Sequence, residues 1–360
     1  MDENSLYFFK FYQKISMKMH DKSALELLVR GDFEKDALHS ALLFKGRERE
    51  QLFELARNKR DEYFPSRQVE VRSVIEISNI CRSKCNFCNI NFYARNRKGY
   101  CLTYEEIMGI AKRLYYKNRK VILLQSGENK SQKYIDFVCK CISGIKKKFK
   151  DLVIILCLGS LSRLQFRQLR QAGAERYILK FETSNPVLYK NIKPDDSLEE
   201  RVNGLVALSE SGFEVGTGNI IGLPGQTIED IVNDLFFIRN FKLTMVSSSV
   251  FIPGEDSNYR NEPKGGINII LNYIALIRIL YPQMLIPSTS SLEKAKKGGQ
   301  HLGLLAGANT VTIHDGTPAG IKKYFPIYSV KRFTPDEKRI KKVVEKAHLI
   351  ANVTMPVKNS

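Results

Sequence analysis

The chain has 360 residues, of which 43% are hydrophobic and 26% are charged, so it can bury the large core of a single α/β domain. No apolar run reaches the roughly 18 residues that predict a transmembrane helix. Residues 1–5 are acidic and lack the basic and apolar regions of a secretory signal. Seven cysteines, three of them at metal-ligand spacing, fit a reducing compartment better than a disulfide scaffold. We therefore expect a cytoplasmic protein that does not act at a membrane.

The formal net charge of +19 has two interpretations. Solvated helix faces explain the basic runs most simply. The alternative is attraction to an acidic partner, such as a carrier protein or a ferredoxin- or flavodoxin-type electron donor. Nucleic acid is not favoured, because aromatic residues do not interleave with the basic runs and no recognition module is present. The runs in question are 146–148, 322–323, 331–332 and 338–342.

Along the chain, residues 1–65 are predicted to form a helical extension, because apolar positions recur at helical spacing over 23–29 and 48–64. Short β-branched runs then alternate with longer amphipathic segments. The predicted strands are 69–78, 120–125, 152–158, 176–181, 213–221, 244–251, 283–288 and 308–313. The predicted helices are 104–116, 134–149, 162–172, 198–211, 228–240, 267–280 and 294–306.

Eight strands that each lead into a helix predict a parallel (βα)₈ barrel of the TIM type over residues 66–330. The basic tail, residues 331–360, is expected to be helical over 336–349 and frayed from residue 350 onward. In such barrels the chemistry takes place at the C-terminal ends of the strands. Candidate functional residues are therefore sought at those ends.

The first strand end carries three cysteines, Cys81, Cys85 and Cys88. Three thiolates at spacings of four and three residues can converge on one metal centre. Structural zinc sites and ordinary iron–sulfur clusters take four protein ligands, and no second Cys or His pair supplies an obvious fourth. A cluster held by three cysteines leaves one iron open, which predicts chemistry at that iron. A zinc knuckle or three unrelated buried thiols is the alternative.

Polar residues also mark the ends of the second and fourth strands. Gly127, between Ser126 and Glu128, lets the backbone approach a ligand closely, and Glu128 can accept a hydrogen bond from an ammonium group. Glu182 is a candidate partner for ligand hydroxyl groups, or else it forms a salt bridge with a neighbouring lysine. Arg201 begins the next helix, and its planar fork suits a carboxylate.

At the eighth strand end, His314 and Asp315 form an adjacent imidazole–carboxylate pair. We predict that His314 contacts substrate, although a histidine in a loop is often structural or solvated. Strand five leads into a tight turn over 222–226, and Thr227 with Asp230 is typical of a helix N-cap box.

The pattern Cys-x-x-x-Cys-x-aromatic-Cys resembles the signature of the radical S-adenosylmethionine (SAM) superfamily. In that family the cysteines hold a 4Fe–4S cluster, SAM chelates the open iron, and reduction yields methionine and a 5′-deoxyadenosyl radical. From roughly residue 23 to residue 330 the chain is similar to the subgroup of biotin synthase, 3-methylornithine synthase and the HydE hydrogenase maturase, and most similar to HydE-like sequences.

This resemblance implies that Cys81, Cys85 and Cys88 are cluster ligands and that a set of polar residues contacts SAM or its surroundings. That set is Ser126, Gly127, Glu128, Glu182 and Arg201. It also implies a substrate-side role for Tyr328, which we predict to be catalytic together with His314. The expected partners are a small-molecule or carrier-bound substrate and a reduced ferredoxin- or flavodoxin-type donor.

The chain departs from the maturase pattern at Asn89, Phe181, 253–256 and 314–316. We expect these positions to line the substrate cavity, so the exact substrate does not transfer. Two reaction types remain open: cofactor biosynthesis or metallocofactor maturation, and sulfur insertion of the biotin or lipoyl type. Sulfur insertion usually needs an auxiliary cluster, for which the spare cysteines are Cys101, Cys139, Cys141 and Cys157. A non-catalytic cluster scaffold is the third possibility.

Overall fold

The computed structural model describes residues 23–94, 98–325 and 337–352. Tyr328, predicted to be catalytic, lies outside these ranges. No helix within them is long and apolar enough to cross a bilayer.

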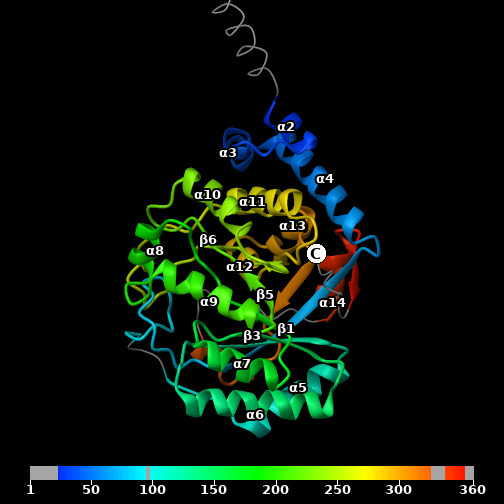
Figure 1. The fold of residues 1–360 in the computed structure, drawn as a ribbon. Helices are drawn as coiled ribbons and strands as arrows, with labels where there is room; N and C mark the ends of the chain where they lie inside the picture. Colours follow the sequence, from blue (N-terminus) through cyan, green and yellow to red (C-terminus); the bar gives the residue numbers. More distant parts are fainter. Residues whose placement is uncertain (1–22, 95–97, 326–336, 353–360) are drawn as a thin grey trace, which may run out of the picture.

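The sheet is a nearly closed barrel of eight parallel strands (Figure 1). Its order is β7-β5-β4-β3-β2-β1-β10-β9, and a bridge between Met245 and Leu285 joins β7 to the segment before β9. Strands β6 (Ile220–Ile221) and β8 (Ser249–Val250) continue β5 and β7 beyond a break and pair with each other. The predicted barrel is therefore confirmed. The other strands are β1 (Gln68–Ser78), β2 (Val121–Ser126), β3 (Val153–Cys157), β4 (Arg176–Ile178), β5 (Glu214–Thr217), β7 (Met245–Val246), β9 (Pro287–Ser288) and β10 (Thr310–Ile313).

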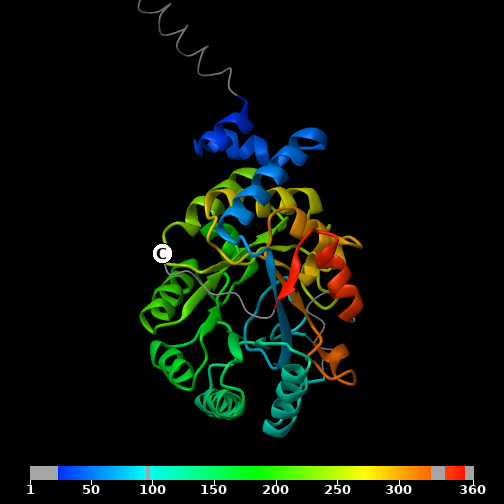
Figure 2. The ribbon, with the colours of Figure 1, turned by 90° about the vertical axis from the view of Figure 1, so that its right-hand side faces the viewer.

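Helices surround the sheet, as the turned view in Figure 2 shows. Several begin at capping boxes that the sequence encodes, with Thr103, Ser162 and Thr227 as the N-cap residues. The ring consists of α5 (Tyr104–Tyr116), α6 (Gln132–Lys148), α7 (Arg163–Gln171), α8 (Pro186–Ile192), α9 (Leu198–Glu210), α10 (Ile228–Ile238), α11 (Ile267–Leu280), α12 (Ser290–Ala295) and α13 (Gly299–Leu305).

The two faces of β1 show how the barrel is filled. Val69, Val71, Ile75 and Ile77 belong to the large core between sheet and helices, whereas Val74 belongs to a smaller core inside the barrel. This alternation follows from the two-residue period of a strand. The other members of the inner core are Val121, Leu123, Ile155, Ile178, Met245 and Leu285.

Charged side chains also lie on the inner face, at the N-terminal ends of the strands. Glu70, which has no exposed surface, binds Arg72 at 2.6 Å and Arg176 at 2.9 Å. A buried carboxylate of this kind is tolerated because two guanidinium groups compensate its charge. The barrel is therefore filled towards this end, and its cavity opens at the C-terminal ends.

The N-terminal helices pack on the outside of the barrel. They are α2 (Ala24–Arg30), α3 (Lys35–Leu43) and α4 (Gly46–Tyr63), and they lie beyond α10 and α11 in Figure 1. Leu38, Leu42 and Leu52 are fully buried in the same core that holds α11. The buried Asn272 of α11 donates to the carbonyl oxygens of Leu42 and Phe44, which satisfies the end of α3.

Several local predictions differ from the structure, besides the strands predicted over 213–221 and 244–251, each of which is divided in two. The single helix expected over 294–306 is two helices, because the chain breaks around Gly298, whose φ is 83°. Strand β4 ends at Ile178 rather than at residue 181. Helix α8 was not predicted, although Asn185 as N-cap and Pro186 at the first turn encode it. Residues 350–352 form a strand, β11 (Ile350–Asn352), which follows α14 (Glu337–Glu345) and pairs with the start of β1.

Candidate active site in the mouth of the barrel

A cavity of about 260 Å³ opens at the C-terminal ends of the strands. Side chains from nearly every barrel strand reach it, as expected for the active-site end of such a fold. Within the described part of the chain, every residue predicted to bind the cluster, SAM or substrate contributes to its wall. These residues are Cys81, Cys85, Cys88, Ser126, Gly127, Glu128, Glu182, Arg201 and His314.

The cysteine loop is held by hydrogen bonds from two buried asparagines. Asn79 accepts from the backbone N–H of Tyr100 at 2.8 Å and donates to the carbonyl of Lys98 at 2.8 Å. Asn91 donates to the carbonyl oxygens of Cys85 (3.2 Å) and Cys88 (2.7 Å). These bonds satisfy the carbonyl groups of Cys85 and Cys88 in a loop with no regular secondary structure, and they connect the residue before the loop to the 98–100 segment.

Gly127 allows the end of β2 to lie directly against this loop. A Cβ atom at Gly127 would be 2.6 Å from both Cβ of Cys81 and the carbonyl oxygen of Ile80. Two hydrogen bonds stabilise the contact: Glu128 N–H donates to Cys81 Sγ (3.3 Å), and Arg82 N–H donates to the Glu128 carbonyl oxygen (2.9 Å). The Ser-Gly-Glu turn and the cysteine loop therefore form one unit.

The chemistry of the three thiols suits an iron–sulfur cluster. Burial raises the pKa of Cys81 to about 11 and also raises the pKa values of Cys85 and Cys88. Bare thiolates would be costly here, and coordination to iron would supply the compensating charge. No three His, Cys, Asp or Glu side chains in the described ranges are grouped tightly enough to hold one metal ion. Each thiolate of a cubane binds a different iron, so cluster ligands lie farther apart than the ligands of one zinc ion.

Beside the cysteines lies a network of two half-buried carboxylates, Glu128 and Asp196, and two buried cations, Lys193 and Arg201. Glu128 contacts Lys193 Nζ at 3.0 Å and Arg201 Nη2 at 3.3 Å. Asp196 contacts the same two cations, at 3.3 Å and 2.5 Å, and Tyr189 bridges Arg201 and Asp196. Burial acts to raise the pKa of Glu128, but the charges of Lys193 and Arg201 hold it below its usual range. Glu128 is therefore a carboxylate that can exchange these cations for a ligand.

Glu182 occupies an unusual backbone position at the cavity wall. Its φ of 61° is left-handed, which a residue other than glycine adopts only at a cost. Its N–H donates to the Gly218 carbonyl (3.1 Å) and its carbonyl accepts from Ile220 N–H (2.9 Å), which hold this conformation. The side chain forms a salt bridge with Lys180 at 3.1 Å, the contact expected from one of the two interpretations of Glu182.

The turn after Glu182 is anchored from outside the barrel by Asp234 of α10. One carboxylate oxygen accepts from the N–H and hydroxyl of Ser184 (2.7 and 2.6 Å), and the other accepts from Asn219 Nδ2 (2.8 Å). Burial raises the pKa of Asp234 to about 7 despite these hydrogen bonds. No pattern along the chain indicates this residue, because its partners are distant in the sequence.

On the opposite wall, His314 pairs with Glu76 of β1, at 2.9 Å, rather than with the adjacent Asp315. Asp315 instead lies 3.6 Å from Arg119. Glu76 was missed in the sequence, although a carboxylate between Ile75 and Ile77 in a fully buried strand is a recognisable signal.

The expectation that all the departures from the maturase pattern line the cavity is wrong. His314 does so, but the side chain of Phe181 lies in the outer core, with its ring centroid 4.8 Å from that of Phe237. Asn89 is buried and accepts a hydrogen bond from the N–H of Asp256 at 2.8 Å. These two positions therefore shape the packing around the cavity rather than its wall.

The spare cysteines are dispersed. Cys157 lines the cavity from β3, as its place on the strand suggested. Cys139 and Cys141 lie on α6, half-buried and buried respectively, and Cys101 is exposed. One cavity cysteine is a poor basis for an auxiliary cluster.

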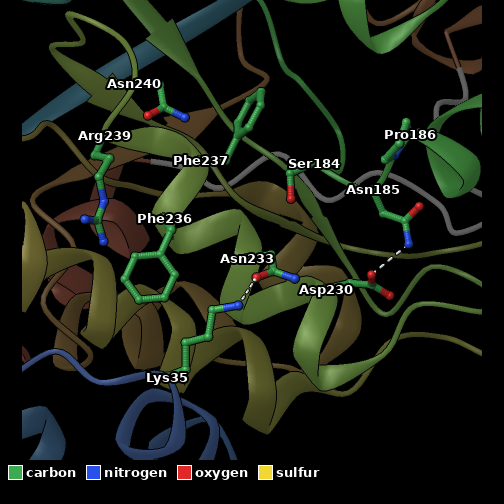
Figure 3. Close-up of a pocket in the computed structure, with 10 residues that line it drawn as sticks. All are labelled: Lys35, Ser184, Asn185, Pro186, Asp230, Asn233, Phe236, Phe237, Arg239 and Asn240. Carbon is green, nitrogen blue, oxygen red and sulfur yellow. Dashed lines mark hydrogen bonds between the residues drawn. The ribbon is translucent and has the colours of Figure 1, made fainter.

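A second pocket, of about 690 Å³, lies on the outside of the barrel between α3, α10 and the turn before α8 (Figure 3). Lys35 reaches across it to Asn233 (3.0 Å), and Asn185 donates to Asp230 (2.8 Å). None of the predicted site residues lines this pocket. Its polar groups thus fasten α3 and α8 to α10.

A parallel barrel with three cysteines beyond its first strand, and a glycine turn pressed against them, defines the radical SAM class of enzymes. The model of the radical SAM superfamily matches residues 75–238. The chain is 37% identical over 316 residues to "[FeFe] hydrogenase maturase subunit HydE" of Thermotoga maritima, covering 87% of this chain and 89% of that protein. The chain belongs to the radical SAM superfamily, whose members bind a 4Fe–4S cluster and SAM.

A second relative and one solved structure are also similar to this chain over most of its length. Biotin synthase of Clostridium acetobutylicum is 29% identical over 263 residues, covering 71% of this chain and 79% of that enzyme. The crystal structure of methylornithine synthase (PylB) superposes with a TM-score of 0.79 at 24% identity, covering 91% of this chain and 97% of that one. This second likeness concerns the fold.

Proposed function

We propose that this radical SAM enzyme is a HydE-type enzyme, which acts on a small polar molecule in the barrel during cofactor biosynthesis or metallocofactor maturation. The observation that carries the proposal is that one cavity of about 260 Å³ joins the cysteine loop to a polar wall deeper in the barrel. A concave site on which polar groups converge from several strands is typical of a small-molecule site. The 37% identity to the Thermotoga maritima HydE favours maturation within this class.

At one end of the cavity, Cys81, Cys85 and Cys88 would hold the cluster, while Glu128 and Arg201 would bind the ammonium and carboxylate of SAM. When bound and reduced, these cofactors supply a 5′-deoxyadenosyl radical. The backbone of Glu182 is held by hydrogen bonds to Gly218 and Ile220. Its carboxylate would accept hydrogen bonds from the ribose hydroxyl groups once its salt bridge with Lys180 is broken. The protein's own part is to bind, to orient and to exclude water from the radical.

The opposite end carries Ser249, Thr289, Ser290, Thr312 and His314. We assign these side chains to the substrate. They include hydroxyl and imidazole groups, so a polar substrate is bound more readily than a hydrocarbon chain. A carrier-bound substrate would also have to thread an arm into the cavity.

Sulfur insertion is the weaker candidate. It requires a sulfur source in the cavity, and Cys157 is the one spare cysteine that the described residues place there.

The test uses anaerobically reconstituted protein. We would count iron per chain and measure 5′-deoxyadenosine formation from SAM with dithionite, with and without a panel of α-amino acids and small thiols. A maturation mixture that lacks its HydE component, supplemented with this protein, tests the finer assignment. Restored hydrogenase activity, lost in Cys85→Ala, supports it. If the protein cleaves SAM reductively but does not restore hydrogenase activity, it is still a radical SAM enzyme and the HydE assignment is refuted. If it binds iron but cleaves no SAM, the enzyme proposal is refuted.

A further inference from the structure

Three polar side chains from separate elements form a hydrogen-bonded chain at the substrate end of the cavity. Glu76 is on the inner face of β1, His314 follows β10, and Ser290 is the first residue of α12. His314 Nδ1 lies 2.9 Å from Glu76 Oε1, and His314 Nε2 lies 3.1 Å from Ser290 Oγ. Glu76 is fully buried, while His314 and Ser290 line the cavity.

The partners of Glu76 determine the direction of this chain. Thr317 donates its hydroxyl to Glu76 Oε2 at 2.9 Å and accepts from the Glu76 N–H at 3.2 Å. An ionised carboxylate only accepts hydrogen bonds, so with Glu76 ionised His314 Nδ1 carries the proton that it shares with Oε1. In a neutral imidazole Nε2 is then an acceptor, and the Ser290 hydroxyl donates to it.

The surroundings keep the imidazole neutral. Burial and the ammonium group of Lys294 on α12 lower the pKa of His314 to about 3, and Lys322 of the 3₁₀ turn η1 (Lys322–Tyr324) acts in the same direction. Asp315, on the same loop as His314, opposes them, and an ionised Glu76 at 2.9 Å acts in the same direction as Asp315. With its hydrogen committed to His314, Ser290 Oγ presents only lone pairs to the cavity.

We propose that Ser290 is a specificity-determining residue whose hydroxyl oxygen accepts a hydrogen bond from a neutral hydroxyl or thiol group of the substrate. The inference rests on the proposed function, since it assigns this wall of the cavity to the substrate. The ammonium groups of Lys294 and Lys322 disfavour a cationic donor at this place, because like charges repel in a buried site. Glu76 and His314 are positioning residues, which act through Ser290.

The orientation is tested by long-range ¹H–¹⁵N spectra of ¹⁵N-histidine-labelled full-length protein. The chain has five histidines, and His314→Gln identifies the signal of interest. We expect a neutral imidazole protonated on Nδ1 at pH 7, whose Nε2 resonance moves in Ser290→Ala and returns in Ser290→Thr. Ser291→Ala, which removes a hydroxyl bonded to Thr289 instead, should leave it unchanged. A proton on Nε2, or no response to Ser290→Ala, overturns the inference.

The specificity is tested with matched probes in the deoxyadenosine assay: L-serine against O-methyl-L-serine, and L-cysteine against S-methyl-L-cysteine. We expect at least one unmethylated compound to stimulate cleavage roughly 10- to 100-fold better than its methylated partner, the effect of leaving a buried acceptor unpaired. The preference should vanish in Ser290→Ala and persist in Ser290→Thr. Equal stimulation within every pair, or none, overturns the inference. Failure of reductive SAM cleavage itself counts against the proposed function, which the spectra do not depend on.

Discussion

The contact between the glycine turn and the cysteine loop can be tested by adding one methyl group. In Gly127→Ala the new Cβ would lie 2.6 Å from Cβ of Cys81 and from the carbonyl oxygen of Ile80, and 2.8 Å from the carbonyl carbon of Ile80. Two of these three atoms belong to the backbone and cannot rotate away. The two segments must therefore separate, which stretches the hydrogen bond from Glu128 N–H to Cys81 Sγ.

Overpacking of this kind costs about 1–3 kcal/mol. We expect urea unfolding of the metal-free chain to show that loss, and the iron content after anaerobic reconstitution to fall with it. Gly109→Ala is the matched control, because a Cβ at Gly109 of α5 meets no atom within 4 Å. In a helix this change should stabilise by up to about 1 kcal/mol. If Gly127→Ala retains both the stability and the iron content of the wild type, the close contact does not organise the cluster site.

Three further predictions address other parts of the barrel. Cys157→Ala should keep the wild-type iron content and SAM cleavage, and a loss of iron would revive the auxiliary cluster. Glu70→Gln should lower the free energy of unfolding by about 3–5 kcal/mol, because the buried Arg72 and Arg176 lose a shared counter-charge. Urea unfolding measures this loss, with Glu62→Gln at an exposed position as the control. Equal effects of the two substitutions would contradict the argument. The raised pKa of Asp234, about 7, means that the native state holds a proton between about pH 4 and pH 7 that the unfolded chain releases. Stability should therefore fall with rising pH across this window by up to about 4 kcal/mol, and Asp234→Asn should flatten the profile; parallel profiles would refute the assignment.

The barrel and the cysteine loop were predictable because both are encoded locally. The strands of a parallel barrel are short and buried, and amphipathic helices separate them, so their order along the chain gives the topology. The three cysteines lie within eight residues of each other. Because active sites of such barrels lie at the C-terminal ends of the strands, Glu128, Glu182 and His314 were expected at the same end of the barrel. All three line the cavity.

The partners of those residues were not predictable in the same way. Lys193 and Asp196 follow α8, a helix that was missed, and Ser290 is one of several hydroxyl residues in a row. Only the three-dimensional contacts distinguish these residues from their neighbours. The error at Phe181 arose because this residue lies beyond the end of β4 at Ile178, where the alternation of a strand no longer determines which way a side chain faces.

The charge balance at the two ends of the cavity explains how it can serve two ligands. At the cysteine end, Glu128 and Asp196 balance Lys193 and Arg201, and the contact between Glu128 and Arg201 at 3.3 Å is one of the two longest in the network. The amino-acid part of SAM is a zwitterion, so it can insert its ammonium beside Glu128 and its carboxylate beside Arg201 without leaving a net buried charge. Lys193 and Asp196 would keep the site neutral during the exchange. At the other end, lysines surround a neutral histidine, and a neutral hydroxyl or thiol avoids adding charge there.

On this argument, replacing Lys193 with methionine should weaken SAM binding even though Lys193 is not itself assigned to the ligand, because Glu128 and Asp196 would then share a single cation. Equilibrium dialysis with labelled SAM measures this, and unchanged affinity would contradict the exchange.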